Sequence, residues 1–212
     1  MAFITFEGIE GSGKTTQVNL ALDWLRDRVD NVLHTREPGG TAIGNRIRAI
    51  LLDPIHAEMA AEAEILLYSA ARAQIVRQVI RPHLEEGGIV ICDRFYDSTL
   101  AYQGYGRGLS LPDLRHITAF ATGGLTPDLT LYLDLAVEAG LRRKAQTPEE
   151  WNRLEAQPLD FHQRVRAGYL ALAAAEPERW RVIDADRPVE VVQEEIRWIL
   201  GDALAAGVRR ET

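Results

Sequence analysis

The sequence predicts an α/β fold: a five-stranded parallel sheet with helices on both faces and a small helical lid. Two observations lead to this fold class. Short apolar runs alternate with amphipathic stretches along the 212 residues, as expected when crossover helices join parallel strands. The run at 88–92 is wholly apolar, which is typical of a strand buried on both faces of a parallel sheet.

The first element is a strand at 2–7, which runs directly into a glycine-rich loop. Residues 8–15 read GIEGSGKT, the complete pattern G-x-x-x-x-G-K-[ST] of a phosphate-binding loop, or P-loop. An amphipathic helix at 16–25 follows. The chain contains only two lysines, so a glycine turn with an unrelated lysine is a rare alternative. The sheet is therefore expected to belong to a three-layer P-loop fold.

This loop has the chemistry of an anion cradle. Its glycines let backbone N–H groups approach phosphate oxygens, and the helix N-terminus adds positive potential. Lys14 is expected to reach the β- and γ-phosphates of ATP, and Thr15 to offer its hydroxyl to Mg²⁺. The predicted nucleotide-binding residues are Gly8, Ile9, Glu10, Gly11, Ser12, Gly13, Lys14, Thr15 and Thr16.

The remaining elements continue the alternation of strands and helices. Further strands are predicted at 31–35, 88–92, 129–134 and 180–184, and helices at 41–52, 57–85, 96–105, 111–122 and 188–206. Ligands of such a sheet bind at the carboxyl ends of its strands. Those ends carry Glu7, Arg36, Asp93, Asp134 and Asp184.

Composition bounds the class of protein. A chain of this length is expected to form a single P-loop kinase domain over 1–212. The net charge of −7 argues against nucleic acid or a membrane surface as partner. No apolar run approaches the length of a membrane span, and Glu7 and Glu10 near the N-terminus are unlike a signal peptide. We therefore expect a cytoplasmic protein. The single cysteine, Cys92, is expected to fill the core.

A charged segment at 141–150, with a proline in its middle, interrupts the alternation. A solvated surface loop is one interpretation. The other is a lid over about 140–160, because a phosphoryl-transfer enzyme has to exclude water from its donor.

The apolar third strand ends in Asp93-Arg94. A strand-end carboxylate in a P-loop protein is placed to hold Mg²⁺ opposite Thr15, although it could instead cap the next helix. Arg94 is suited to an incoming phosphate, with an ordinary ion pair as the alternative. The D-x-x-G and N-K-x-D motifs of GTPases do not occur, so these residues favour a small-molecule kinase.

At this point the chain resembles the bacterial-type thymidylate kinase family over nearly its whole length. The second and third of four motif blocks are the specific ones. The blocks are 6–17 (FEGIEGSGKTTQ), 36–41 (REPGGT), 93–103 (DRFYDSTLAYQ) and 152–155 (NRLE), the last leading to Phe161.

The resemblance implies transfer of the γ-phosphoryl group of ATP to dTMP, which gives dTDP. It implies that Glu10 faces the deoxyribose 3′-hydroxyl, that Tyr68 stacks on thymine and that Arg72 hydrogen-bonds the base. Periodicity alone favours simple helix packing for Tyr68. Arg94 matches the arginine that grips the acceptor phosphate. The remaining substrate-binding candidates are Arg36, Ser98, Thr99, Tyr102 and Gln103.

The sequence departs from one family pattern, because the P-loop contains no arginine. The family then takes the catalytic arginine from the lid, where Arg143 and Arg153 match best. The predicted catalytic set is therefore Lys14, Arg94, Arg143 and Arg153. The family is homodimeric, and the apolar 57–85 helix, Ile117, Phe120 and the closing helix suggest the interface.

Rival functions remain at this stage. A deoxynucleoside kinase would phosphorylate the free nucleoside, and another nucleoside monophosphate kinase would take a different base. A P-loop binding protein without turnover is disfavoured by Lys14, Thr15 and Asp93.

Overall fold

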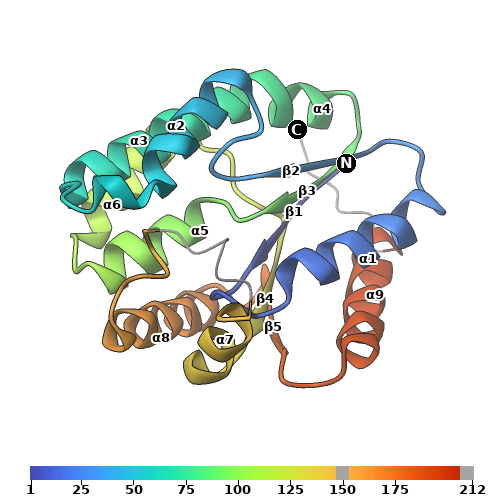
Figure 1. Ribbon diagram of the computed structural model, residues 1–212. Coiled ribbons are helices and arrows are strands. Elements are labelled where there is room, and N and C mark those ends of the chain that lie inside the picture. Colours follow the sequence, from blue (N-terminus) through green and yellow to red (C-terminus); the bar gives the residue numbers. More distant parts are fainter. Residues whose placement is uncertain (147–152, 206–212) are drawn as a thin grey trace.

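The computed structural model describes residues 1–146 and 153–205 and contains a five-stranded parallel sheet (Figure 1). The strand order is β2-β3-β1-β4-β5, which confirms the predicted fold class. The strands are β1 (Ala2–Glu7), β2 (Val32–Arg36), β3 (Ile89–Asp93), β4 (Leu129–Asp134) and β5 (Trp180–Asp184).

The centre of the sheet is fully enclosed. All six residues of β1 are buried, because β3 and β4 flank it and helices cover both of its faces. In register, Phe6 of β1 lies beside Asp93 of β3 and Leu131 of β4. β1 ends one residue beyond β3 and two residues before β4, so the side chains that follow the three central strands meet at one edge of the sheet.

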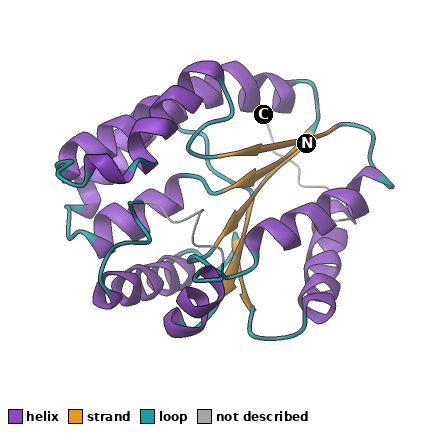
Figure 2. Ribbon diagram, viewed as in Figure 1, coloured by secondary structure: helices purple, strands orange, loops and turns teal. Residues whose placement is uncertain are grey.

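Helices form the two outer layers (Figures 1 and 2). α1 (Lys14–Arg26) and α9 (Val189–Ala205) pack together on one face. On the other face, α3 (Ala61–Ile75) packs against α2 (Ala42–Leu52) and α6 (Leu111–Thr122). The remaining helical elements are α4 (Arg81–Glu85), α5 (Tyr96–Thr99), α7 (Val137–Lys144), α8 (Leu159–Ala175), a 3₁₀ turn at Pro54–His56 and two π-type segments, η2 (Val76–Ile80) and η3 (Leu100–Gly106).

Three helices differ from the sequence-based expectation. The long helix predicted at 57–85 begins at Ala61 and contains η2 before α4. The helix predicted at 96–105 is α-helical only through α5 and continues as η3. α8 was not predicted. Of the expected lid, α7 and the segment from Arg153 are described, whereas its tip at 147–152, with Asn152, lies outside the described residues.

None of the helices within 1–146 and 153–205 is both long and apolar enough to cross a lipid bilayer. The expectation of a single domain over 1–212 stays a prediction.

Candidate active site

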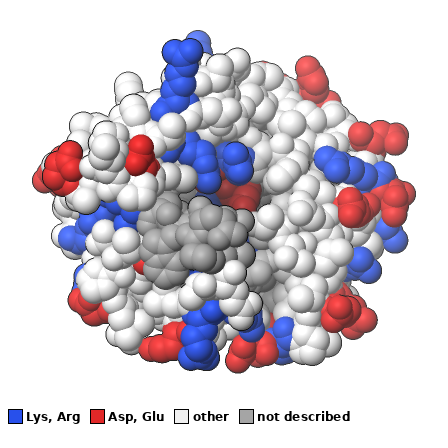
Figure 3. All heavy atoms as spheres, viewed as in Figure 1, with Lys and Arg blue, Asp and Glu red and all other residues white. Residues whose placement is uncertain are grey.

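A cavity of about 610 Å³ opens at the carboxyl ends of β1, β2 and β3. Its walls come from the P-loop, the turn after β2, α3, the segment after β3, and α7. Figure 3 shows acidic and basic side chains together in this depression. The predicted site residues among its lining are Glu10, Gly11, Ser12, Gly13, Lys14, Thr15, Thr16, Arg36, Tyr68, Arg72, Asp93, Arg94, Ser98, Thr99, Tyr102, Gln103 and Arg143. The lining does not include Gly8, Ile9 or Arg153.

The P-loop shape requires glycine, as positions 13 and 8 show. Gly13 caps α1 with φ of 83°, in the left-handed region that glycine adopts without strain. At Gly8, a Cβ atom would lie 2.7 Å from Ser12 Oγ and 2.9 Å from the Leu133 carbonyl oxygen. These two glycines bend the chain tightly between the buried end of β1 and the start of α1.

Lys14 extends back across this loop. Its Nζ donates to the carbonyl oxygens of Gly8, at 2.9 Å, and Ile9, at 3.2 Å. Burial, together with the nearby Arg94 cation, lowers the pKa of Lys14 to about 8. The lysine charge is thus costly in the protein alone, and an anion in the loop would stabilise it.

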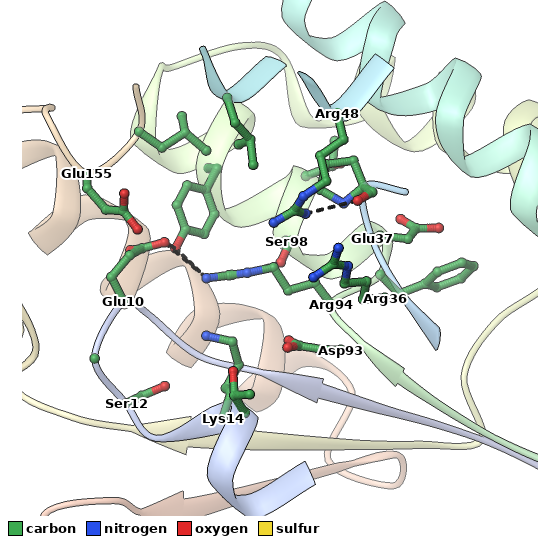
Figure 4. A pocket seen from close by; sticks show the side chains of 18 of the residues that line it. Glu10, Ser12, Lys14, Arg36, Glu37, Arg48, Asp93, Arg94, Ser98 and Glu155 are labelled. Atoms are coloured by element: carbon green, nitrogen blue, oxygen red, sulfur yellow. Dashed lines mark hydrogen bonds and ion pairs between the residues drawn. The ribbon is translucent and has the colours of Figure 1, made fainter. Parts of the chain in front are cut away.

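Arg94 is held by hydrogen bonds at both ends of its guanidinium group, and Figure 4 shows the end that faces Glu10. Nη1 donates to Ser98 Oγ and Tyr169 OH, both at 3.1 Å. Nη2 donates to Glu10 Oε1 at 3.0 Å and to Tyr102 OH at 3.2 Å. The backbone of Arg94 is left-handed, with φ of 68°, an uncommon conformation for a residue with a Cβ that often marks functional sites.

Two carboxylates flank this guanidinium. Glu10 Oε1 also accepts a hydrogen bond from Tyr102 OH at 2.6 Å. Burial opposes ionisation of Glu10, but Arg94 and Lys14 outweigh it and lower the pKa of this carboxyl group. On the other side, Glu7 is fully buried at the end of β1, and burial raises its pKa.

The second oxygen of Glu10, Oε2, is buried and has no hydrogen-bond partner among the described residues; nor does the Ser12 hydroxyl. Such orphaned acceptors are costly unless a ligand satisfies them. Both residues line the cavity, so their unused polar atoms are available to a bound molecule.

The site fits a magnesium ion held together with phosphates. Asp93 Oδ1 is buried and makes no hydrogen bond within the described residues, and Thr15 stands exposed at the start of α1. No cluster of three or more His, Cys, Asp or Glu side chains suited to a metal occurs in the described parts of the chain. Mg²⁺ needs no such cluster, because one carboxylate, waters and substrate phosphates commonly complete its shell.

The far wall of the cavity is aromatic and polar. Tyr68 of α3 is buried but lines the cavity. One turn further along α3, Arg72 donates through Nε to Glu37 at 2.7 Å and through Nη1 to Thr99 at 3.0 Å. Burial raises the pKa of Glu37 to about 7 despite this ion pair. Gln103 donates to Glu64 at 2.7 Å. These bonds orient side chains that the family resemblance associates with the nucleotide base.

Arg36 and Arg48 add further positive charge, and both point towards Arg94 in Figure 4. Arg48 of α2 donates to the Pro38 carbonyl oxygen at 2.9 Å. Burial and the neighbouring Arg36 lower the pKa of Arg48. A cavity that gathers cations in this way is complementary to a phosphate group.

The two lid arginines have different environments. Arg143 lines the cavity and donates to the Ala185 carbonyl oxygen at 3.3 Å and to Asp186 at 2.9 Å. Arg153 is buried and donates to the Leu51 carbonyl oxygen and to Glu64. The structure therefore brings Arg143, but not Arg153, to the cavity.

Sequence reasoning missed several groups that build the site, among them Glu7, Glu37, Arg48 and Tyr169. Glu7 was recognised only as a strand end. Tyr169 lies on the unpredicted α8, whose buried residues Phe161, Val165 and Tyr169 recur with a helical spacing. That spacing was the one local signal that could have revealed this wall of the site.

The fold and the site define a P-loop kinase: a P-loop, the buried carboxylate of Asp93 and a group of cations share one cavity at the end of a parallel sheet. A model of the thymidylate kinase family matches residues 6–196. The chain belongs to this family.

Similar proteins agree with this assignment. A thymidylate kinase from Roseiflexus sp. (strain RS-1) is 56% identical over 221 residues, covering 99% of this chain and 98% of that protein. The thymidylate kinase of Deinococcus radiodurans is 56% identical over 194 residues, with 92% and 93% covered. A crystal structure of thymidylate kinase from Ehrlichia chaffeensis superposes with a TM-score of 0.75 at 34% identity, covering 94% of this chain and 98% of that one.

Proposed function

We propose that this protein transfers the γ-phosphoryl group of ATP to dTMP and releases dTDP and ADP. The observation that carries the proposal is that two cations, Lys14 and Arg94, line the same cavity. The Arg94 cation helps to lower the pKa of Lys14, so the two charges disfavour each other until anions lie between them. Two phosphorylated substrates that meet there supply those anions.

On the donor side, the P-loop from Gly8 to Thr16 takes the triphosphate of ATP, with Lys14 at the β- and γ-phosphates. Asp93 and Thr15 would hold Mg²⁺, which would offset the negative charge of the phosphates. The unpartnered Oδ1 of Asp93 supports this assignment.

On the acceptor side, Arg94 takes the phosphate of dTMP, and Arg36 and Arg48 add positive charge around it. The base lies against Tyr68, with Arg72, Thr99 and Gln103 as polar contacts, and Ser98 and Tyr102 complete the wall. Glu10 faces the sugar, where its Oε2, which makes no hydrogen bond within the described residues and lies 3.8 Å from His162 Nδ1, can accept a hydrogen bond from a hydroxyl group.

Catalysis then consists mainly of positioning and charge neutralisation. Donor and acceptor phosphates repel each other, and Lys14 and Arg94 offset this repulsion and hold them in line. A phosphate oxygen is already ionised at neutral pH, so the reaction requires no general base. Arg143 is the lid cation proposed to reach the transferring group, because it matches the family pattern and lines the cavity.

The decisive test is acceptor choice. Purified protein with ATP and Mg²⁺ is offered dTMP, thymidine or AMP, and dTDP and ADP are quantified by chromatography. We expect dTDP from dTMP and no turnover of thymidine, because Arg94 needs an acceptor phosphate. Turnover of thymidine would favour the deoxynucleoside kinase instead, and turnover of AMP alone would indicate a different base specificity.

We further propose a homodimer in the cytoplasm, formed through α3 and α6. Phe120 of α6 is 91% exposed and Leu66 of α3 is 59% exposed, and these two helices pack together. Large exposed apolar side chains on neighbouring helices are typical of an interface. The closing helix does not belong to this surface, because α9 packs on α1 at the opposite side of the sheet (Figure 1).

The interface is tested with Phe120→Glu and, as a control, Trp198→Glu on α9, where Trp198 is 72% exposed. Light scattering is expected to show a monomer for the first variant and an unchanged dimer for the second. A dimeric Phe120→Glu variant would reject this interface.

A further inference from the structure

Glu7 supports Arg94 from the core side of the cavity wall, and the proposed chemistry does not use it. Glu7 is the last residue of β1 and is completely buried. It does not line the cavity. A buried carboxylate needs several hydrogen bonds to be tolerated. Among the described residues, Glu7 accepts hydrogen bonds from the amide of Phe95, which follows Arg94, and from the hydroxyl groups of Ser98 and Tyr169, which both contact Arg94.

One oxygen of Glu7 fixes the backbone around Arg94. Glu7 Oε1 accepts a hydrogen bond from the Phe95 N–H group at 2.8 Å. The Arg94 N–H group donates to the Phe6 carbonyl oxygen at 3.0 Å. Arg94, with its left-handed φ of 68°, is thus pinned at its own amide and at the next. This turn directs the arginine side chain over the end of the sheet.

The other oxygen of Glu7 orders two hydroxyl groups. Glu7 Oε2 accepts from Ser98 Oγ at 2.6 Å and from Tyr169 OH at 2.8 Å. The two hydroxyl oxygens are 2.8 Å apart, so one hydroxyl group could donate to the other instead of to Glu7. In each arrangement the hydroxyl protons point to Glu7 or to each other, and lone pairs remain on the side of Arg94.

Those lone pairs accept hydrogen bonds from Nη1 of Arg94, which is 3.1 Å from each hydroxyl oxygen. The pattern is repeated at Nη2, where Tyr102 OH donates to Glu10 and its oxygen lies 3.2 Å from Nη2. In both cases a carboxylate takes a hydroxyl proton and so turns the hydroxyl into an acceptor for the guanidinium group. Glu10 does this from the cavity side, and Glu7 does it from within the core.

We infer that Glu7 is a positioning residue for the acceptor phosphate: it acts through Ser98, Tyr169 and the Phe95 amide to hold the Arg94 guanidinium in its binding orientation. The inference rests on the proposed role of Arg94. It predicts that loss of the Glu7 carboxylate weakens binding of the acceptor's phosphate group but not of its nucleoside part.

The test is Glu7→Gln, which keeps the size of the side chain and one acceptor for the Phe95 amide. Its NH₂ group would donate where Glu7 Oε2 accepts. The hydroxyl groups of Ser98 and Tyr169 would then have to turn, and their protons would face Arg94. Calorimetry measures the Kd values of dTMP, thymidine and ADP for the variant and the wild type, and steady-state assays give KM and kcat.

We expect the Kd for dTMP to rise about 10-fold or more, since a charge-assisted contact is misaligned. The Kd values for thymidine and ADP are expected to stay within about 3-fold of wild type. The matched control is Asp97→Asn, because Asp97 is equally buried but is paired with Arg179 and does not line the cavity. This control should lose stability without a change in the ratio of thymidine to dTMP affinity.

An unchanged Kd for dTMP in Glu7→Gln would overturn the inference, and so would an equal weakening of dTMP and thymidine. If that variant does not fold, Tyr169→Phe removes one of the two hydroxyl groups and should still weaken dTMP selectively. An unchanged affinity ratio in Tyr169→Phe would then reject the inference. Failure of the proposed function is seen separately, as absence of dTDP formation by the wild type.

Discussion

The Arg143 guanidinium group donates to the Asp186 carboxylate across 2.9 Å and thereby ties α7 to the loop after β5. The Arg143 side chain is 44% exposed and that of Asp186 is 66% exposed. An ion pair with this exposure contributes about 0–1 kcal/mol. Arg143 can therefore exchange Asp186 for a phosphate at little cost, which a catalytic lid cation has to do.

The first prediction concerns this exchange. Arg143→Ala is expected to lower kcat about 100-fold or more, because it removes a cation that stabilises the transferring phosphoryl group. The Kd values of ATP and dTMP should change little, since the lid contact develops mainly in the transition state. Steady-state kinetics and equilibrium binding together separate the two effects.

Arg142→Ala is the matched control, because Arg142 is the preceding residue of the same helix and does not line the cavity. Its kcat should stay close to that of the wild type. Near-normal turnover of Arg143→Ala would show that another group carries out this role.

The second prediction is a pH dependence of nucleotide binding. The pKa of Lys14 is lowered to about 8 by burial and by Arg94, and a nucleotide prefers the charged lysine. Below pH 8 Lys14 already carries its proton, and above pH 8 binding has to take one up. The Kd of ADP should therefore be flat from pH 7 to near 8 and then rise by up to about 10-fold per pH unit.

Calorimetry in buffers of different ionisation enthalpy measures the Kd of ADP and the proton uptake together. Lys14→Met should bind ADP more weakly and lose the pH dependence above 8. A Kd of ADP that stays constant between pH 7 and 9.5 in the wild type would show that the pKa of Lys14 is not lowered to about 8.

The third prediction concerns the metal. Asp93→Asn replaces the carboxylate whose Oδ1 is buried without a hydrogen bond in the described residues. The concentration of Mg²⁺ required for half-maximal activity is expected to rise about 10-fold or more, because a neutral amide is a poorer magnesium ligand. Binding of ADP in the presence of EDTA should be nearly unchanged. An identical magnesium requirement in both proteins would place the ion elsewhere.

Sequence patterns were sufficient for the parts of the fold that depend on local periodicity. The five predicted strands agree with the observed ones to within about one residue at each end. The P-loop, Asp93 and Arg94 could also be predicted, since a strand end in a parallel sheet specifies where a side chain lies in space.

The sequence was less informative where packing overrides periodicity. The helix predicted at 96–105 changes to the π-type segment η3 after Thr99, although the apolar spacing continues without a break. α8 was not predicted, because the charged segment before it favoured a lid over about 140–160. Its apolar positions carried the helical signal, but Pro158, immediately before α8, gave no Ser, Thr, Asp or Asn cap to mark the start.

The long-range contacts behind the cavity could not be predicted. Glu7 and Tyr169 are separated by 162 residues and meet through one hydrogen bond. Both residue types also fit ordinary core positions, so no spacing rule links them. The resemblance to a family identified many groups that line the cavity, although not Arg48. Glu7 and Tyr169, which lie behind them, follow only from the coordinates.

The last prediction separates the two lid arginines. Arg153 is buried and donates to Glu64, which also accepts two hydrogen bonds from Arg107 at 2.8 Å each. This pair ties the segment after the lid tip to α3, one turn before Tyr68. Arg153→Met keeps much of the side-chain volume but removes the donor. It is expected to lower the free energy of unfolding by about 1–3 kcal/mol.

Arg107→Met should lower the stability by a similar amount, because it removes the other guanidinium group from the same carboxylate. At a temperature where both variants are folded, kcat should stay within about 3-fold of the wild type. Thermal unfolding and steady-state kinetics measure both quantities. If instead Arg153→Met lost about 100-fold in kcat at unchanged stability, Arg153 would have to leave Glu64 during turnover, and the catalytic role predicted from the sequence would be correct.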